Sequence, residues 1–126
     1  MKFIITESKI EKIIFRFLDM KDYNIVKKKY SPILGQKKAK TIVGTYYHFV
    51  SPGNDYSDIR YSSWDGRLFI TTELIEEVMD MFSIEDDDTL IYISEWVEKQ
   101  LEREIDVLNV SYIGRGSVFG LGIFDL

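Results

Sequence analysis

The dipeptide Asp65-Gly66 is the strongest local signal in the chain. Two segments rich in β-branched and aromatic residues, 59–64 and 67–71, flank it directly. Asp-Gly favours a two-residue hairpin turn, because both turn residues need a positive φ angle that Gly and Asp tolerate. A turn this tight joins antiparallel neighbours. The sequence therefore predicts an antiparallel hairpin over residues 59–71.

Three segments have the apolar spacing of amphipathic helices. The first runs from Thr6, a plausible N-cap, to about Asp22. The second is capped by Thr71 or Thr72 and ends near residue 82. The third runs to about residue 104 and opens at Ser83-Ile84-Glu85-Asp86, which resembles a capping box. Its predicted buried stripe consists of Leu90, Ile93, Val97 and Leu101.

The remaining segments predict an α+β fold. Besides the hairpin, strands are expected at 3–5, 41–50, 107–113 and 118–124. The resulting order, β-α-β-β-β-α-α-β-β, contains many hairpins and few parallel crossovers. A chain of 126 residues fits one domain. We therefore expect a single α+β domain over residues 1–126, with a mostly antiparallel sheet of about five to six strands packed with three helices.

Charge is divided unevenly along the chain. Residues 1–50 contain eleven Lys and Arg against four Asp and Glu, whereas residues 51–126 contain five against seventeen. The basic half is concentrated in the stretch 27–40, which is predicted to be a loop with at most a short strand or turn inside it. Its lysines are Lys27, Lys28, Lys29, Lys37, Lys38 and Lys40. Such a division predicts that electrostatics govern what the protein contacts.

The acidic half is concentrated in the second and third predicted helices. Its candidate contact residues are Glu73, Glu76, Glu77, Asp80, Asp86, Asp87 and Asp88. A simpler explanation remains open, because acids at a helix N-terminus stabilise the helix dipole and a charged row can be an ordinary solvated face.

Composition excludes several classes of protein. The chain has no Cys, so disulfides, thiolate zinc sites and cysteine nucleophiles are excluded. No apolar run approaches the length of a membrane span, and the N-terminal run is too short for a signal peptide. We expect no membrane contact, no secretion and no cofactor, and either an intracellular location or a place in a particle assembled inside a cell. The acidic pI of about 4.9 argues against direct binding to nucleic acid.

Candidate catalytic and ligand-binding residues are few. His48 is the single histidine and would need an orienting carboxylate to act as a base. Asp86–Asp88 are consecutive on a helix, so their carboxylates diverge and cannot share one ion. Asp55 and Asp58 lie in a loop-like segment where a cation could bind. The Gly-rich segment 114–122 has no helix after it, which favours a hairpin turn over a phosphate loop.

Aromatic residues gather in the middle of the chain. Residues 46–69 hold seven of the eighteen aromatic side chains, and strand alternation sends some of them out of the core. Tyr and Trp are frequent anchors of protein interfaces. Tyr47, Tyr56, Tyr61 and Trp64 are the candidate anchors, and a well-packed sheet explains the same pattern.

The N-terminal residues carry a resemblance. Lys2-Phe3-Ile4-Ile5-Thr6-Glu7-Ser8, leading into an Ile-rich helix, is similar to the start of many small uncharacterised proteins of tailed bacteriophages. The resemblance implies a phage-encoded protein that builds the virion or binds a host factor. It transfers no catalytic residue.

Three hypotheses follow. The first is a non-enzymatic protein–protein interaction module, a phage structural or accessory component whose basic loop and acidic helices join copies head to tail or contact other virion proteins. The second is an acidic inhibitor that mimics nucleic acid and binds a host nucleic-acid-binding enzyme. The third is a small metal-dependent enzyme centred on Asp55 and Asp58.

Overall fold

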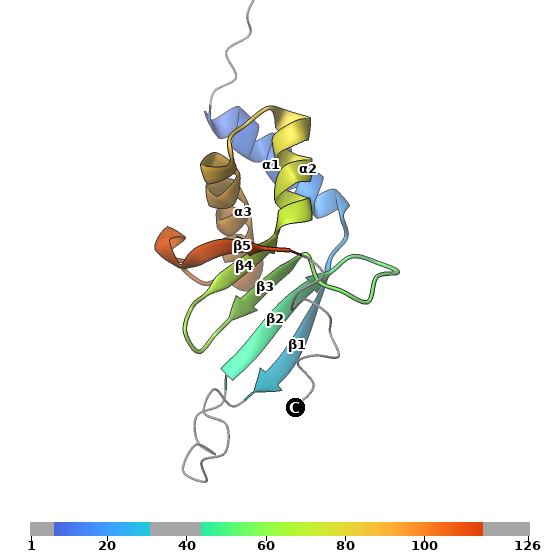
Figure 1. Cartoon of the computed structure of the whole chain (residues 1–126), viewed down its shortest axis with the longest axis vertical. Coiled ribbons are helices and arrows are strands. Elements are labelled where there is room, and N and C mark those ends of the chain that lie inside the picture. The colour runs from blue at the N-terminus through green and yellow to red at the C-terminus, as the bar shows by residue number, and fades with distance from the viewer. Residues whose placement is uncertain (1–6, 31–43, 115–126) are drawn as a thin grey trace, which may run out of the picture.

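The computed structural model describes residues 7–30 and 44–114 (Figure 1). Within these residues, three helices and five strands form one α+β unit, which confirms the predicted fold class. In chain order they are α1 (Glu7–Met20), β1 (Asn24–Tyr30), β2 (Gly44–Val50), β3 (Ile59–Ser62), β4 (Leu68–Thr71), α2 (Thr72–Phe82), α3 (Asp86–Leu101) and β5 (Val110–Ile113). A 3-10 turn, η2 (Val107–Asn109), precedes β5.

The strands of this described part follow the order β1-β2-β3-β4-β5. Strands β1 to β4 form an antiparallel meander, as expected for a sheet built from hairpins. Strand β5 instead lies parallel to β4, because the chain first crosses over through α2 and α3. The predicted second closing strand at 118–124 and the predicted first strand at 3–5 lie outside the described residues.

The β3–β4 hairpin exists, but the prediction of a two-residue turn is wrong. Strand β3 ends at Ser62, and its N–H donates to the Arg67 carbonyl at 2.9 Å. Gly66 N–H closes the loop on the Ser62 carbonyl at 2.9 Å. Gly66 adopts a φ of 71°, whereas Asp65 keeps a negative φ and accepts the Arg67 N–H on its carboxylate at 3.1 Å. The longer loop needs only one residue with positive φ, and glycine supplies it.

The predicted lysine-rich loop is partly wrong as well. Lys27, Lys28 and Lys29 belong to β1 and pair in register with Tyr47, Tyr46 and Thr45 of β2. Lysines suit a strand at the end of a sheet, because their charge opposes pairing with another strand. Lys37, Lys38 and Lys40 lie outside the described residues.

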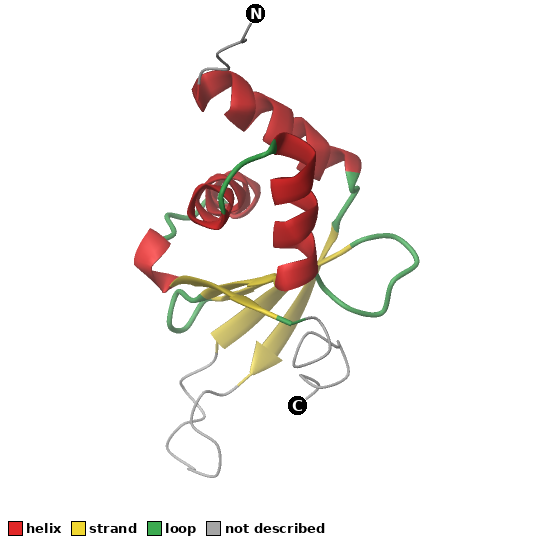
Figure 2. Cartoon of the chain, turned by 45° about the horizontal axis from the view of Figure 1, so that its top comes forward, coloured by secondary structure: helices red, strands yellow, loops and turns green. Residues whose placement is uncertain are grey.

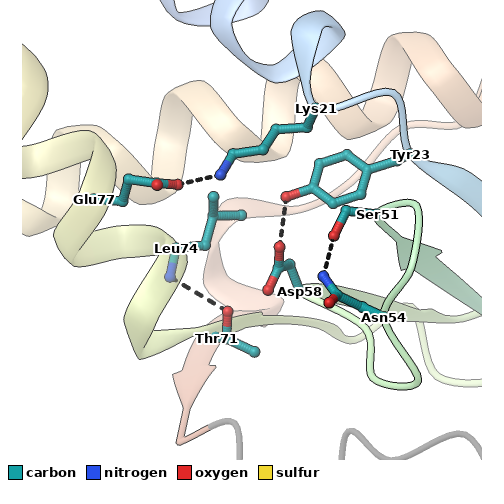
Figure 3. Close-up of polar contacts among 8 residues, drawn as sticks. All are labelled: Lys21, Tyr23, Ser51, Asn54, Asp58, Thr71, Leu74 and Glu77. Carbon is teal, nitrogen blue, oxygen red and sulfur yellow. Dashed lines mark hydrogen bonds and ion pairs between the residues drawn. The ribbon is translucent and has the colours of Figure 1, made fainter.

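Of the N-caps predicted for α2 and α3, the structure confirms the first and not the second. Thr71 caps α2, and its hydroxyl accepts the Leu74 N–H at 3.4 Å (Figure 3). The predicted capping box before α3 is wrong: Ser83 has a φ of 52° and ends α2 in the left-handed conformation. Glu85 occupies the N-cap of α3 without a side-chain cap bond. A residue that ends one helix in this conformation cannot also cap the next.

The core lies between the three helices and one face of the sheet (Figure 2). We call this face of the sheet the helix face; it consists of Phe49, Ile59, Tyr61, Leu68 and Ile70. Trp96 of α3 packs on Phe49 with ring centroids 5.5 Å apart, and its indole N–H donates to Asp19 of α1 at 3.0 Å. The helices contribute Ile14, Leu18, Leu74, Ile75, Val78, Ile93 and Val97.

Candidate interaction surfaces

The lysines of β1 do not form one basic patch. Successive side chains of a strand point to opposite faces, so Lys27 and Lys29 share one side and Lys28 takes the other. Lys27 and Lys29 are exposed, and Lys28 is half-buried. The Lys27 ammonium lies 5.7 Å from the centre of the Tyr47 ring, a cation–π contact within the chain. The structure therefore divides the charge that the sequence places in one run.

The predicted acidic residues are all exposed. Glu73, Glu76, Glu77 and Asp80 lie on α2, and Asp86–Asp88 form the first turn of α3. Asp86 accepts the Asp87 N–H at 2.9 Å, which is local helix-end chemistry. Glu77 forms an ion pair with Lys21, which follows α1 in the chain (Figure 3).

The predicted aromatic anchors have different environments. Tyr61 is 5% exposed and belongs to the core, so it cannot anchor a partner at the surface. Tyr47 and Tyr56 are half-buried, and the Tyr47 hydroxyl accepts a hydrogen bond from Arg103 at 3.3 Å. Trp64, in the β3–β4 loop, is 53% exposed. Among these four residues, Trp64 alone is available as an exposed anchor.

The two loop carboxylates, Asp55 and Asp58, lie in different environments. Asp58 is 4% exposed and accepts a hydrogen bond from the Tyr23 hydroxyl at 2.8 Å (Figure 3). Asp55 is exposed. In the same loop, the Asn54 amide donates to the Ser51 hydroxyl. Across residues 7–30 and 44–114, no group of three His, Cys, Asp or Glu side chains is placed to hold a metal ion. The Gly-rich segment lies outside the described residues except for Gly114.

His48 lies on the face of the sheet opposite the helix face. We call this the second face, defined by Tyr46, His48, Arg60, Ser62 and Phe69. His48 is 0% exposed, and its Nδ1 lies 3.3 Å from the Ser57 hydroxyl. Burial lowers the pKa of His48 to about 4, assisted by the positive charges of Arg60 and Lys28. The imidazole of His48 is therefore neutral at neutral pH.

An apolar groove runs between α1 and α2, and sequence reasoning did not find it. Its volume is about 490 Å³. Phe17 and Phe82 form its floor with an edge-to-face contact, 5.8 Å between ring centroids at 87°. Large apolar side chains are exposed around it: Met20 at 79%, Met81 at 56% and Ile13 at 44%. An exposed apolar cluster rimmed by charges is typical of a protein-binding surface.

The charged side chains that line the groove are basic, and the acids of α2 are not among its lining residues. Arg16 and Lys21 line the α1 side. Helix α2 contains four acidic residues and no basic one, and Glu77 and Asp80 are its acids nearest in sequence to Met81. The Lys21–Glu77 ion pair joins the walls at one end, and the Lys21 ammonium also lies 5.1 Å from the Phe17 ring centre. The groove is thus lined mainly by apolar side chains, with the basic residues Arg16 and Lys21 on its α1 side.

A second, smaller cleft lies between the end of α1, β1 and α3. Its volume is about 190 Å³, and its walls include Tyr23, Trp96 and Gln100. Small-molecule sites typically occupy roughly 300–1,000 Å³. This cleft is below that range, and its Asp19 carboxylate is engaged by the Trp96 indole. The α1–α2 groove is therefore the better candidate for a functional surface.

Comparisons with protein-family models, with curated proteins and with solved structures returned no match to this chain. In the part of the chain that the structure describes, no helix combines the length and the apolar character needed to cross a membrane.

Proposed function

We propose that this protein is a non-enzymatic interaction module and that the α1–α2 groove docks a protein partner. The observation that carries the proposal is the exposure of Met20, Met81 and Ile13 around the Phe17–Phe82 floor. Methionine is flexible and polarisable, so it adapts to the shape of a partner. Removing these side chains from water on binding would stabilise a complex.

The size of that stabilisation limits the affinity that apolar contacts in the groove can provide alone. Complete burial of a Met or Ile side chain contributes about 1.5–3 kcal/mol, and these three are already partly covered. Their sum is of the same order as the about 4–15 kcal/mol that association costs in lost freedom. A partner must therefore also interact favourably with the charged side chains that line the groove, Arg16 and Lys21, so charge selects the partner as much as apolar contact does.

The resemblance of residues 2–8 to proteins of tailed bacteriophages supports a place in virion assembly or in an accessory role. In that setting the partner is another copy of the chain, joined head to tail or otherwise, or a second virion protein. The module acts in the host cytoplasm or in the particle.

The test replaces exposed apolar side chains around the groove by polar ones without changing the net charge of the protein. The double variant Met20→Gln, Met81→Gln keeps the side-chain size at two exposed positions, so the fold is retained. Leu108→Gln is the matched control, because Leu108 is 88% exposed on η2, away from the groove. Proteins captured from the source organism would be purified and their binary affinity measured by calorimetry. We expect at least a tenfold loss of affinity for the double variant and none for the control. Equal affinity of the wild type and both variants would refute the proposal that the groove is the binding site.

The exposed acids favour a second candidate, the inhibitor that mimics nucleic acid. The acids of α2 and of the start of α3 form the negative surface that such an inhibitor needs. In this case Glu76→Lys with Asp80→Lys abolishes binding to a nucleic-acid-binding enzyme, while Met20→Gln with Met81→Gln leaves it unchanged. Fluorescence competition with a DNA duplex distinguishes the two candidates, since only the mimic is displaced by it.

A further inference from the structure

We propose that the partner of the groove is a protein segment that forms an amphipathic helix, with acidic side chains along one edge of its apolar face. This inference rests on the proposed function, and it specifies the class of partner. It follows from which charges near the groove are paired within the chain and from the spacing of the bases along α1.

The apolar side chains of the groove form a surface on which a helix can lie. Ile13, Phe17 and Met20 follow one another on α1 at intervals of four and three residues, so they form a single stripe. Met81 and Phe82 line the α2 side of the groove. An amphipathic helix that places its apolar anchors in such a groove is a recurring mode of protein recognition.

Exposed basic residues follow this apolar stripe on its solvent side. Lys9, Lys12 and Arg16 are three and four residues apart on α1, so they share one side of the helix. The fully buried Ile14 and Leu18 lie on the opposite side of the stripe. All three bases are exposed, and none of them forms an ion pair with a carboxylate in the described part of the chain. Their charge is therefore free to meet a partner.

The acids near the groove are mostly engaged within the chain. Glu77 forms its ion pair with Lys21 (Figure 3). Asp19 of α1 accepts the indole N–H of Trp96 at 3.0 Å. Asp80, in the last turn of α2, is exposed but does not line the groove. The charge that the groove offers to a partner is therefore mainly positive, although the whole chain has a net charge of −5. Acidic side chains on the α1 side of the partner match it, and basic ones there are repelled.

The spacing of the three bases favours a helix over an extended segment. A rise of about 1.5 Å per residue spreads Lys9, Lys12 and Arg16 over about 10 Å of α1. Acids at intervals of three and four residues on a partner helix form one row of the same length, so three acids can meet three bases. An extended segment places residues of one side about 6.6 Å apart, so only two of its acids fit the same length.

An anionic lipid surface is the other occupant that exposed apolar and basic side chains suit. The shape of the surface favours a protein. A helix that lies in a lipid interface presents one convex apolar face. Here the apolar side chains instead line a groove of about 490 Å³ between two helices, into which the side chains of a partner helix can insert.

The test uses synthetic peptides that differ only in charge. Each has about 18 residues in an Ala-rich background, which is long enough for an isolated helix, and carries the same Leu stripe at helical spacing. The edge of the stripe carries Glu, Gln or Lys. Fluorescence anisotropy measures binding of each labelled peptide to the full chain. We expect the Glu peptide to bind about tenfold more tightly than the Lys peptide, with the Gln peptide between them. The difference should shrink as salt rises.

Charge reversal on α1 tests whether the row of bases causes this preference. Lys12→Glu with Arg16→Glu should invert it, so that the Lys peptide binds best. Lys27→Glu with Lys29→Glu is the matched control, because it makes the same change in net charge at two exposed positions of β1, away from the groove (Figure 1). The control should keep the preference for the Glu peptide. Circular dichroism verifies that each variant is folded.

The apolar part of the contact is tested separately. Met20→Gln with Met81→Gln should weaken all three peptides by a similar factor, because it removes apolar contact and leaves the charges in place. If this variant leaves the affinity of the Glu peptide unchanged, the bases act outside the groove and the proposal is overturned.

Other results would also overturn the acidic helix. They are equal affinity for the three peptides, an inversion by the β1 control, and no binding of any peptide up to millimolar protein. Binding to vesicles of phosphatidylserine and phosphatidylcholine instead of the peptides would point to a lipid surface. Self-association that the Met20→Gln, Met81→Gln variant abolishes would point to a second copy of the chain. The interaction module itself is judged by the captured partners: it falls only if that variant binds them as well as the wild type does.

Discussion

Both faces of the sheet contain buried residues, and the two faces are built from different chemistry. Ile59 and Arg60 are neighbours in β3 and point to opposite faces; Ile59 is 0% exposed and Arg60 is 7% exposed. The helix face around Ile59 is a packed apolar core. On the second face, the Arg60 guanidinium lies between two rings, 4.8 Å from Tyr46 and 4.7 Å from Phe69. Burial along a strand therefore does not imply an apolar environment.

The difference has a physical cause. Arginine has a flat, weakly hydrated guanidinium that stacks on aromatic rings, so it can be withdrawn from water at a lower cost than an ammonium group. His48, opposite Arg60 in the register, can be buried because its imidazole is neutral, and that burial in turn lowers its pKa. Stability on the helix face thus depends on volume, whereas stability on the second face depends on protonation and stacking.

The largest expected effect is on the helix face. Ile59→Ala removes three carbon atoms from a fully buried site and leaves a cavity against the helices. We expect a loss of about 4 kcal/mol in the free energy of unfolding, since Ile-to-Ala changes in cores cost about 2–5 kcal/mol. Ile59→Val should cost only about 1 kcal/mol. Urea denaturation measures both, and a loss below about 1 kcal/mol for Ile59→Ala would mean that this face is not the core.

The next effect is the pH dependence that His48 imposes. Its pKa is about 4 in the folded protein and about 6.5 in the unfolded chain, so the unfolded state binds the proton first as pH falls. His48 does not affect the free energy of unfolding well above pH 6.5, and stability is lost as pH falls from about 6.5 to 4, by at most about 3.4 kcal/mol. We expect His48→Gln to remove this slope. Because carboxylates titrate mainly below about pH 5, the comparison is clearest between about pH 5 and 6.5.

A smaller effect follows from Arg60. Arg60→Met keeps much of the side-chain length but removes the stacked charge, and we expect a loss of about 2 kcal/mol from two cation–π contacts of about 0.5–2 kcal/mol each. The same variant should raise the pKa of His48, because a neighbouring positive charge is removed. The chain has a single histidine, so its imidazole protons can be titrated by NMR without assignment. An unchanged pKa would show that the charge of Arg60 does not contribute to lowering it.

Local features were predictable from the sequence. The Thr71 cap of α2 is encoded within a few residues, and the structure confirms it. The apolar face predicted for this helix comprises Leu74, Ile75, Val78, Met81 and Phe82. The first three are buried, whereas Phe82 is half-buried and Met81 is 56% exposed. Of the stripe predicted for α3, Ile93 and Val97 are fully buried. Trp96 was missed there, because its burial depends on Phe49 and on the Asp19 carboxylate, which come from distant parts of the chain.

Features that depend on tertiary pairing were not predictable. Strand β1 was not predicted, because a run of lysines does not by itself indicate a strand. The residues form one because they pair with Tyr46 and Tyr47 of β2. Alternation in β3 shows that Arg60 and Tyr61 point to opposite faces, but it does not say which face the helices cover. The groove needs Phe17 and Phe82 together, 65 positions apart in a sequence with no motif to link them.

The smallest expected effect concerns the helix cap at Thr71. It tests whether this cap is independent of the protonation of His48 on the second face. Thr71 shares strand parity with Phe69, is 0% exposed, and uses its hydroxyl to accept the Leu74 N–H at the start of α2. Thr71→Val keeps the shape but leaves that N–H without the cap, and we expect a loss of about 1 kcal/mol, near the middle of the range for helix caps. Thr71→Ser, which keeps the hydroxyl, is the control and should lose less. Because a cap is neutral, the difference between the two variants should be the same at about pH 5 and pH 7; a difference that grows at the lower pH would place Thr71 in the same protonation-dependent network as His48.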